Sequence, residues 1–260
     1  MTLRTPLAKL LLAVTGALLL LFIVGPLLRL VLEAGPRSLG DAFGDAEVRR
    51  AIGLTLVTAT TATLLGAVLG LPLAWALARR RFPGSGIVEA IVDLPVVVPH
   101  PVAGIALLLF LGRRSVVGGA LAALGLEVVN HPGGIVAAMA FVSLPILVSG
   151  AREAFTTVDL RLERVARSLG DAPFTAFRRV TLPLAGRGIL AATLLAWARA
   201  VSEFGAVVVL TYNPKVASVL IFDRFTTDGL AGTLPAALAL LLVALLVFGA
   251  VRLLRPRSVA

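Results

Sequence analysis

The residues of this chain that could do chemistry in an apolar environment lie close together in its last third. Residues 197–210 read WARAVSEFGAVVVL and place Arg199, Ser202 and Glu203 in an otherwise apolar stretch. Arg199 and Glu203 are four residues apart, so a helix would hold them on one face, where they can form an ion pair. Two interpretations stand. Either the pair fixes the packing of one helix against another, or it lies on a path for a solute.

A second segment combines polar residues with residues that interrupt helices. Residues 92–108 read VDLPVVVPHPVAGIALL and include Asp93, Pro99 and His100. The prolines and Gly104 predict that no regular helix begins before Val102. An interrupted backbone at this point either lines a path or supports a gate, or it is an ordinary loop at the edge of an apolar layer.

The chain lacks the residues needed for disulfides, for thiolate metal sites and for nucleotide binding through a Walker A motif. The chain has no cysteine, so it can form neither a disulfide nor a thiolate metal site. His100 and His131, its two histidines, are far apart in the sequence, which argues against a metal cluster. Neither lysine is followed by Ser or Thr, as a Walker A motif requires. We therefore expect no catalytic residue, no metal and no cofactor in this chain.

The composition indicates a membrane protein. Hydrophobic residues make up 58% of the 260 residues and charged residues only 15%, whereas a soluble domain has about 25% charged residues. A run of about 20 apolar residues is long enough to cross a bilayer. We expect an all-α protein with six transmembrane helices. The candidate spans are Leu10–Leu28, Ala51–Ala78, Leu94–Gly112, Pro132–Ala151, Gly188–Tyr212 and Gly229–Val251.

The positive charges predict the orientation in the membrane. With the N-terminus in the cytoplasm, the segments 1–9, 79–81, 152–187 and 251–260 lie inside and hold more Lys and Arg than the outer segments. This bias predicts a multi-pass protein of the cell membrane with both termini cytoplasmic. The net charge of +10 then reflects a basic inner face beside anionic lipid, so no nucleic-acid partner is expected.

The longest inner segment, residues 152–187, has its own pattern. Leu162, Val165, Ala166 and Leu169 share one face of a predicted helix. Gly170 is expected to end that helix, Asp171 to cap a second short helix with Pro173 in its first turn, and Pro183 to break the chain again. The first helix either lies at the lipid interface or docks into a groove of another protein.

The spacing within this segment resembles a known loop. Gly170 is followed by nine residues and then by Val180-Thr181-Leu182-Pro183. This is similar to the cytoplasmic "EAA" loop of ABC importer permeases, and Ala166, Gly170, Val180, Leu182 and Pro183 match its pattern. The sequence departs from it at Arg164, where the family usually has Glu, and at Val165, where it often has Ala. Glu163 lies one residue early.

The resemblance implies a role for the loop. In that family it forms a coupling helix that sits in a cleft of a separate ATPase subunit, which uses ATP and Mg. The positions that would contact or orient the ATPase are Leu162, Glu163, Val165, Ala166, Leu169, Gly170, Asp171, Leu182 and Pro183. The implied assembly is a homodimer of the permease with two ATPase subunits and an extracytoplasmic binding protein. The implied fold is that of an ABC type I importer permease.

Two further motifs resemble those of oxyanion permeases. Arg-x-x-x-Glu-Phe-Gly-Ala, starting at Arg199, recurs in molybdate, tungstate and sulfate permeases. The run from Pro99 to Leu107 is most similar to the archaeal-type molybdate/tungstate permease. The resemblance implies import of molybdate or tungstate, with Asp93, Pro99, His100, Arg199, Ser202 and Glu203 as candidate pathway or gate residues. A sulfate or thiosulfate permease and an ion-coupled secondary transporter are the alternatives.

The expected organisation has three parts. Residues 1–50 would hold the first transmembrane helix and an outer loop, residues 51–250 the permease core of five helices with the loop 152–187, and residues 251–260 a cytoplasmic tail.

Overall fold

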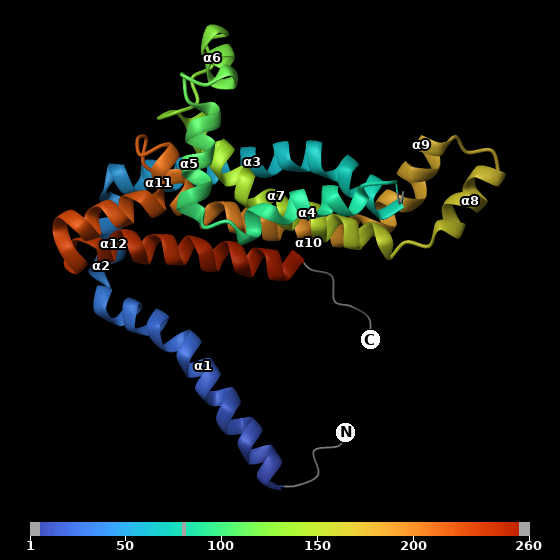
Figure 1. The fold of residues 1–260 in the computed structure, drawn as a ribbon. Helices are drawn as coiled ribbons and strands as arrows, with labels where there is room; N and C mark the ends of the chain where they lie inside the picture. Colours follow the sequence, from blue (N-terminus) through green and yellow to red (C-terminus); the bar gives the residue numbers. More distant parts are fainter. Residues whose placement is uncertain (1–5, 80–81, 255–260) are drawn as a thin grey trace.

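The computed structural model describes residues 6–79 and 82–254, and the regular structure within these ranges is helical (Figure 1). The expected all-α fold is therefore confirmed. The long helices are α1 (Pro6–Ala34), α3 (Ala46–Arg79), α7 (Pro132–Thr156), α10 (Leu182–Val201) and α12 (Ala217–Leu254). The shorter helices are α2 (Arg37–Gly44), α4 (Ser85–Val97), α5 (His100–Leu111), α6 (Val116–Ala123), α8 (Leu160–Ser168), α9 (Pro173–Ala176), the π-helix η1 (Phe177–Thr181) and α11 (Gly205–Leu210).

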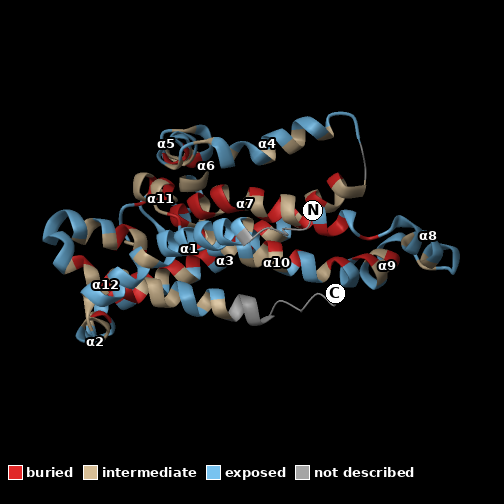
Figure 2. Ribbon diagram, turned by 90° about the horizontal axis from the view of Figure 1, so that it is seen from below, coloured by how far each residue is buried: buried red, intermediate tan, exposed pale blue. Residues whose placement is uncertain are grey.

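Helix α7 forms the centre of the bundle and packs against both α3 and α10 (Figures 1 and 2). Small residues let these backbones approach closely. A Cβ atom at Gly150 of α7 would lie 2.7 Å from the Cβ of Ala192, and one at Gly188 of α10 would lie 2.5 Å from the Cβ of Ala154. The α7–α10 contact therefore depends on glycine at both positions.

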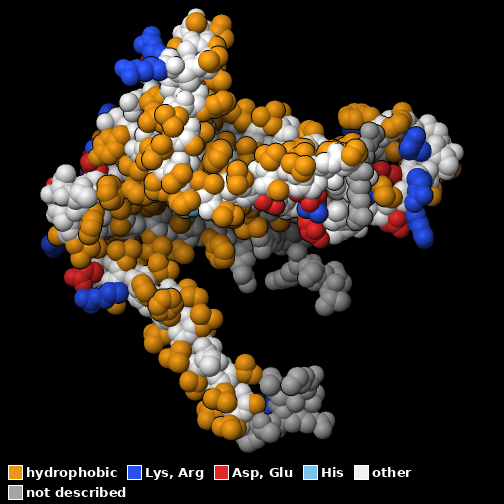
Figure 3. Space-filling view, in the orientation of Figure 1, with side chains coloured by type: hydrophobic (Ala, Val, Ile, Leu, Met, Phe, Trp, Pro, Cys, Tyr) orange, Lys and Arg blue, Asp and Glu red, His pale blue; other side chains and the backbone are white. Residues whose placement is uncertain are grey.

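Hydrophobic side chains cover the outside of the bundle as well as its core. Figure 3 shows them along its flank, with Lys and Arg gathered mainly toward the ends. Helix α1 stands away from the bundle, and its apolar side chains are almost all exposed. Among residues 6–79 and 82–254, five helices are long and apolar enough to cross a membrane, and the number of spans rises to six when the bent pair α4–α5 is counted as one. The prediction of six spans is confirmed on these terms.

The predicted span Leu94–Gly112 is not one straight helix. Helices α4 and α5 meet at an angle of 115°, and α4 already begins at Ser85. Val98 is extended, with φ −71° and ψ 128°, because the ring of Pro99 disfavours helical backbone in the preceding residue. Helix α5 begins at His100, two residues before the predicted earliest start, with Pro101 in its first turn.

The last two predicted spans also differ from the structure. The segment Gly188–Tyr212 is interrupted, because α10 ends at Val201 and α11 begins at Gly205. Helix α12 begins at Ala217, earlier than the predicted start at Gly229. The helix is kinked at Gly229. Gly229 has φ 70° and ψ −164°, a conformation open to glycine but not to other residues without strain.

The glycine contacts predict a matched pair of variants. Gly188→Ala should lower the thermal stability of the purified protein, because forcing a methyl group into the α7–α10 contact costs about 1–3 kcal/mol. Gly186→Ala, on the same helix, has open space around its Cβ position and should be neutral or slightly stabilising. Thermal unfolding of both variants in detergent is the measurement. Equal stability of the two would contradict the importance of this contact.

Candidate functional site

The two interrupted helices meet each other within the bundle. Helix α5, after the first break, packs against α11, after the second. A Cβ atom at Gly104 would lie 2.8 Å from the carbonyl oxygen of Ala206, and one at Gly205 would lie 2.7 Å from the Cβ of His100. The two backbones therefore touch directly, and they bring residues about a hundred positions apart in the sequence into one site.

A polar cluster lies at this meeting point. Arg199 Nη2 donates to Glu203 Oε2 at 2.8 Å and also contacts His100 Nε2. His100 Nε2 lies 3.7 Å from Glu203 Oε2. The ion pair predicted from the spacing is confirmed, although Glu203 lies beyond the end of α10 rather than on its face. The carboxylate is only 1% exposed, while Arg199 and His100 are partly accessible.

Glu203 holds together the segments around the second break. Its Oε1 accepts a hydrogen bond of 2.8 Å from the backbone N–H of Ala206, in the first turn of α11. Its carbonyl oxygen accepts a hydrogen bond of 2.7 Å from Ser218 Oγ on α12. A buried carboxylate is stable only where cations and N–H donors replace the lost water, and here both kinds of partner are present.

The other predicted pathway residues are divided between this cluster and other places. Ser202 Oγ accepts a long hydrogen bond of 3.4 Å from Arg199 Nη1, and Pro99 precedes His100 at the bend. Asp93 lies elsewhere, because its Oδ1 accepts a hydrogen bond of 2.9 Å from Ser149 on α7. The cluster thus presents a guanidinium, an imidazole and a hydroxyl on its accessible side, with the negative charge buried behind them.

The segment 152–187 forms a projection at one end of the bundle (Figure 1). Helix α8 covers most of the helix predicted there, and Gly170 follows it with φ 102°, the positive value expected of a residue that ends a helix. The apolar side chains of Leu162, Val165 and Leu169 are exposed, Leu169 at 82%. This face therefore finds no partner within the described part of the chain.

Two details of this segment differ from prediction. Ala172, not Asp171, occupies the N-cap of α9, because the Asp171 carboxylate instead accepts from Arg179 Nη1 at 3.1 Å. Pro183 does not break the chain. It lies in the first turn of α10, which continues directly from η1, where the N–H of Leu182 donates to the carbonyl of Phe177. The wider π-turn accommodates the proline within a continuous helical path.

Glu163 does not lie on the exposed apolar face of α8. Its carboxylate points to the bundle, where Oε1 accepts from Thr181 Oγ1 and lies 3.6 Å from Arg79 Nη2. The sequence singled out neither Arg79 nor Thr181. Arg79 was interpreted only as one of three basic residues at a membrane edge, and no local pattern pairs it with a residue 84 positions later.

Comparison with known proteins identifies the family. A family described as "Binding-protein-dependent transport system inner membrane component" matches residues 62–259, most of the chain. The chain belongs to this family.

Individual permease proteins are also similar to this chain in sequence. It is 40% identical over 239 residues to the molybdate/tungstate transport system permease protein of Pyrococcus furiosus, with 90% of this chain and 89% of that protein covered. It is 33% identical to a probable sulfate transport system permease protein of Zygnema circumcarinatum, with 88% and 81% covered.

A solved structure shows the fold. A chain of a bacterial alginate ABC transporter, in complex with an alginate pentasaccharide-bound periplasmic protein, matches with a TM-score of 0.77 at 19% identity. The match covers 96% of this permease and 94% of that chain. The predicted family and the expected fold of an ABC importer permease are thus confirmed.

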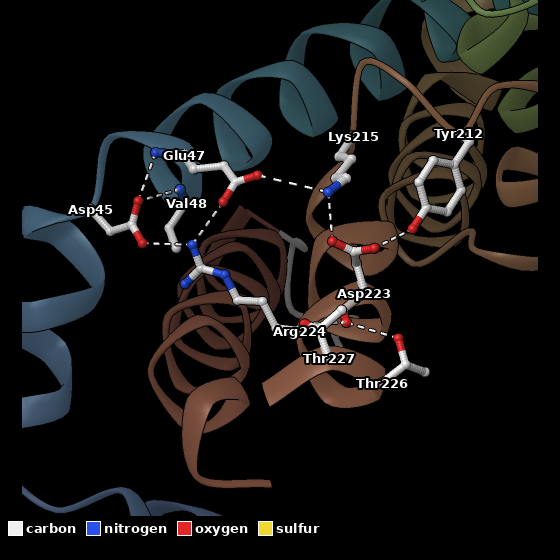
Figure 4. A network of polar contacts seen from close by, with 9 residues as sticks. All are labelled: Asp45, Glu47, Val48, Tyr212, Lys215, Asp223, Arg224, Thr226 and Thr227. Atoms are coloured by element: carbon white, nitrogen blue, oxygen red, sulfur yellow. Dashed lines mark hydrogen bonds and ion pairs between the residues drawn. The ribbon is translucent and has the colours of Figure 1, made fainter. Parts of the chain in front are cut away.

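A second polar network in this permease was not predicted from the sequence (Figure 4). It lies at the end of the bundle opposite α8. Arg224 Nη2 of α12 donates to Asp45 Oδ2 at 2.6 Å and to Glu47 Oε2 at 2.9 Å. Lys215 Nζ donates to Asp223 Oδ2 at 2.5 Å. The network joins the start of α3, the loop after α11 and the first turns of α12.

The hydrogen bonds of this network shift the titration of its members. The hydrogen bond from Arg224 lowers the pKa of Asp45, and the hydrogen bond to Asp223 raises the pKa of Lys215. Tyr212 Oη also donates to Asp223. All of these groups therefore keep their charges, or for Tyr212 its proton, near neutral pH. No sequence pattern indicates the network, because Asp45 and Arg224 are 179 positions apart.

The charged cluster predicts an ordering of variants. Glu203→Gln keeps an oxygen for the N–H of Ala206 but leaves Arg199 without its counter-ion. It should therefore lose about 3 kcal/mol or more of stability. The double variant Arg199→Gln/Glu203→Gln should recover part of that loss, because it leaves no unpaired charge. Thermal unfolding in detergent tests the order. If the double variant is less stable than Glu203→Gln, neutralising Arg199 is not the reason that position 203 needs a carboxylate.

Proposed function

We propose that this permease forms the membrane path of an ATP-driven importer for an oxyanion, molybdate or tungstate. The likeness to the Pyrococcus furiosus molybdate/tungstate permease protein supports the substrate, since it extends over nine-tenths of the chain at 40% identity. The exposed apolar face of α8 is the observation that carries the mechanism. A helix with such a face fits a groove on a separate subunit, which would bind and hydrolyse ATP with Mg.

The polar cluster supports a path for an anion. Arg199 and His100 offer N–H donors on the accessible side, while Glu203 neutralises the guanidinium from the buried side. The Ser202 hydroxyl accepts from Arg199 Nη1 and donates to the carbonyl oxygen of Arg199. An unneutralised cation in a low-dielectric setting would hold a doubly charged oxyanion tightly. Conduction instead needs binding that is favourable enough for entry and weak enough for release, which a neutralised arginine provides.

The assembly follows from the surfaces that remain uncovered. Helices α4 and α5 expose Ile91, Val97, Val102 and Leu109 away from the bundle, and α4 has no buried residue among those described. We infer that a second copy of this chain covers part of this apolar surface about a two-fold axis and that lipid covers the rest. A binding protein outside the cell would deliver the oxyanion to the end that carries the network of Figure 4.

We propose that α8 lies in the cytoplasm. Residues 152–187 form the longest basic segment, and the positive-inside rule assigns it to the cytoplasmic side together with both termini. This placement puts the apolar face of α8 where an ATPase subunit can reach it.

A sulfate permease is the second candidate, because the probable sulfate permease protein of Zygnema circumcarinatum is 33% identical to this chain. The two differ in the solute carried and not in architecture, so transport assays separate them. An ion-coupled transporter would need no ATPase.

Reconstitution tests the proposed function. Proteoliposomes containing the permease, its ATPase and its binding protein should accumulate molybdate only when ATP and Mg are supplied. Excess tungstate should compete with molybdate, and excess sulfate should compete weakly. Within this assay, Val165→Asp should reduce co-purification of the ATPase by roughly tenfold or more, since docking would bury an unpaired carboxylate.

Ser168→Asp is the control, because it adds the same charge to α8 at a position off the Leu162–Val165–Leu169 face. It should keep both the ATPase and transport. Normal association of Val165→Asp would contradict docking through this face. Uptake without ATP would favour the secondary transporter, and stronger competition by sulfate than by tungstate would favour the sulfate permease.

Single cysteines test the orientation, since the natural chain has none. Ser168→Cys should be shielded from a membrane-impermeant thiol reagent in intact cells and should react after the cells are opened. Lys215→Cys, at the other end of the bundle, should react in intact cells. Labelling of Ser168→Cys from outside would reverse the topology.

A further inference from the structure

Helix α8 has few attachments to the rest of the chain. It packs mainly against α9 and η1, and its apolar face points away. A movement imposed on α8 from outside would therefore need a specific link to reach the long helices. The contacts of Arg79, the last residue of α3, provide such a link.

The Arg79 side chain is 6% exposed at the end of α3. Its Nη1 donates to the carbonyl oxygen of Val158 at 2.7 Å, two residues before α8 begins. Its Nη2 lies 3.6 Å from Glu163 Oε1 in the middle of α8. One guanidinium thus contacts both the chain entering α8 and the helix itself.

Glu163 extends this link to a third element. The oxygen that faces Arg79 also accepts the hydroxyl of Thr181, which is fully buried in η1 at the start of the path into α10. Glu163 is 17% exposed, compared with 82% for Leu169 on the outer face of the segment. The carboxylate therefore faces the bundle and joins α8 to both α3 and α10.

Aromatic packing supports the same junction. Phe177 of η1 contacts the ring of Trp75, with centroids 5.5 Å apart, and the ring of Phe155 on α7, with centroids 6.1 Å apart. Trp75 and Arg79 are four residues apart and so share one face of α3. The last turns of α3 thus hold the α8–η1 segment through the ring of Trp75 and through the polar contacts of Arg79.

The contact between Arg79 and Glu163 contributes little to the stability of the fold. Within the described residues, Arg79 Nε and Nη2 have no hydrogen-bond acceptor although both atoms are buried. Buried ion pairs contribute little net stability even when they are well bonded, and unused buried donors reduce the contribution further. The arrangement instead fixes the position of α8 relative to two long helices.

We propose that Arg79, Glu163 and Thr181 form a latch that transmits the displacement of α8 to α3 and α10. They act as positioning residues and do not contact the ATPase. This inference rests on the proposed docking of α8 onto an ATPase. Loss of the latch should leave ATPase binding intact, because the Leu162–Val165–Leu169 face is unchanged, and should uncouple ATP hydrolysis from uptake.

The test uses the complete transporter in proteoliposomes and measures ATPase co-purification, ATP hydrolysis and oxyanion uptake. Glu163→Gln and Arg79→Gln should keep the ATPase and hydrolyse ATP. Uptake per ATP hydrolysed should fall roughly fivefold or more, as expected when a coupling free energy is lost. Glu89→Gln is the matched control. It removes the carboxylate of the 3.5 Å ion pair between Glu89 of α4 and Arg152 of α7, which does not involve α8, and should leave the ratio unchanged.

Thr181 offers a pair of variants with little risk of unfolding. Thr181→Val keeps the shape but removes the hydroxyl and should lower the coupling ratio, whereas Thr181→Ser keeps the hydroxyl and should preserve it. Unchanged ratios in Glu163→Gln and Thr181→Val would overturn the latch. Loss of ATPase binding in Glu163→Gln, to the level of Val165→Asp, would also overturn it by placing Glu163 in the contact surface. Failure of the docking proposal shows separately, as normal ATPase binding by Val165→Asp.

Discussion

The bilayer requires every backbone N–H and C=O group to find its partner within the protein, and this requirement governs where the helices of this permease can be interrupted. The breaks before His100 and after Val201 lie against each other, with Gly104 and Gly205 allowing the backbones to touch. Glu203 then supplies an acceptor to the freed end of α11. A charged side chain in an apolar layer is thus retained because it satisfies both a backbone group and an arginine.

The same requirement separates the rigid and adaptable parts of the molecule. Helices α3, α7 and α10 satisfy their own backbones and approach each other through small residues, so they form a bundle with little room for rearrangement. The surfaces proposed above to contact solutes or partners lie mainly on or beside short helices. Helices α5, α8 and α11 each depend on a few directed polar contacts or on glycine to hold their places.

Local patterns in the sequence predicted the local features correctly. The apolar period of α8, the positive φ of Gly170 and the ion pair between Arg199 and Glu203 all follow from spacings of a few residues. The interruption at residues 202–204 could not be predicted this way, because it depends on Ser218 and on the packing of α5 against α11. The prediction that Asp171 caps α9 was wrong because the Asp171 carboxylate accepts a hydrogen bond from Arg179, eight residues later. Arg79 and the network around Arg224 link positions too far apart for any periodic pattern to show.

The network of Figure 4 has a consequence for the approach of solutes. Arg224 lies within 2.9 Å of two carboxylates, and Lys215 lies 2.5 Å from a third. Cations neutralised at such short range contribute little potential beyond a Debye length of about 8 Å at physiological ionic strength. The network itself therefore does not attract free anions over long distances. Capture of a dilute anion from solution would then fall to a carrier with its own affinity, the role proposed above for the binding protein.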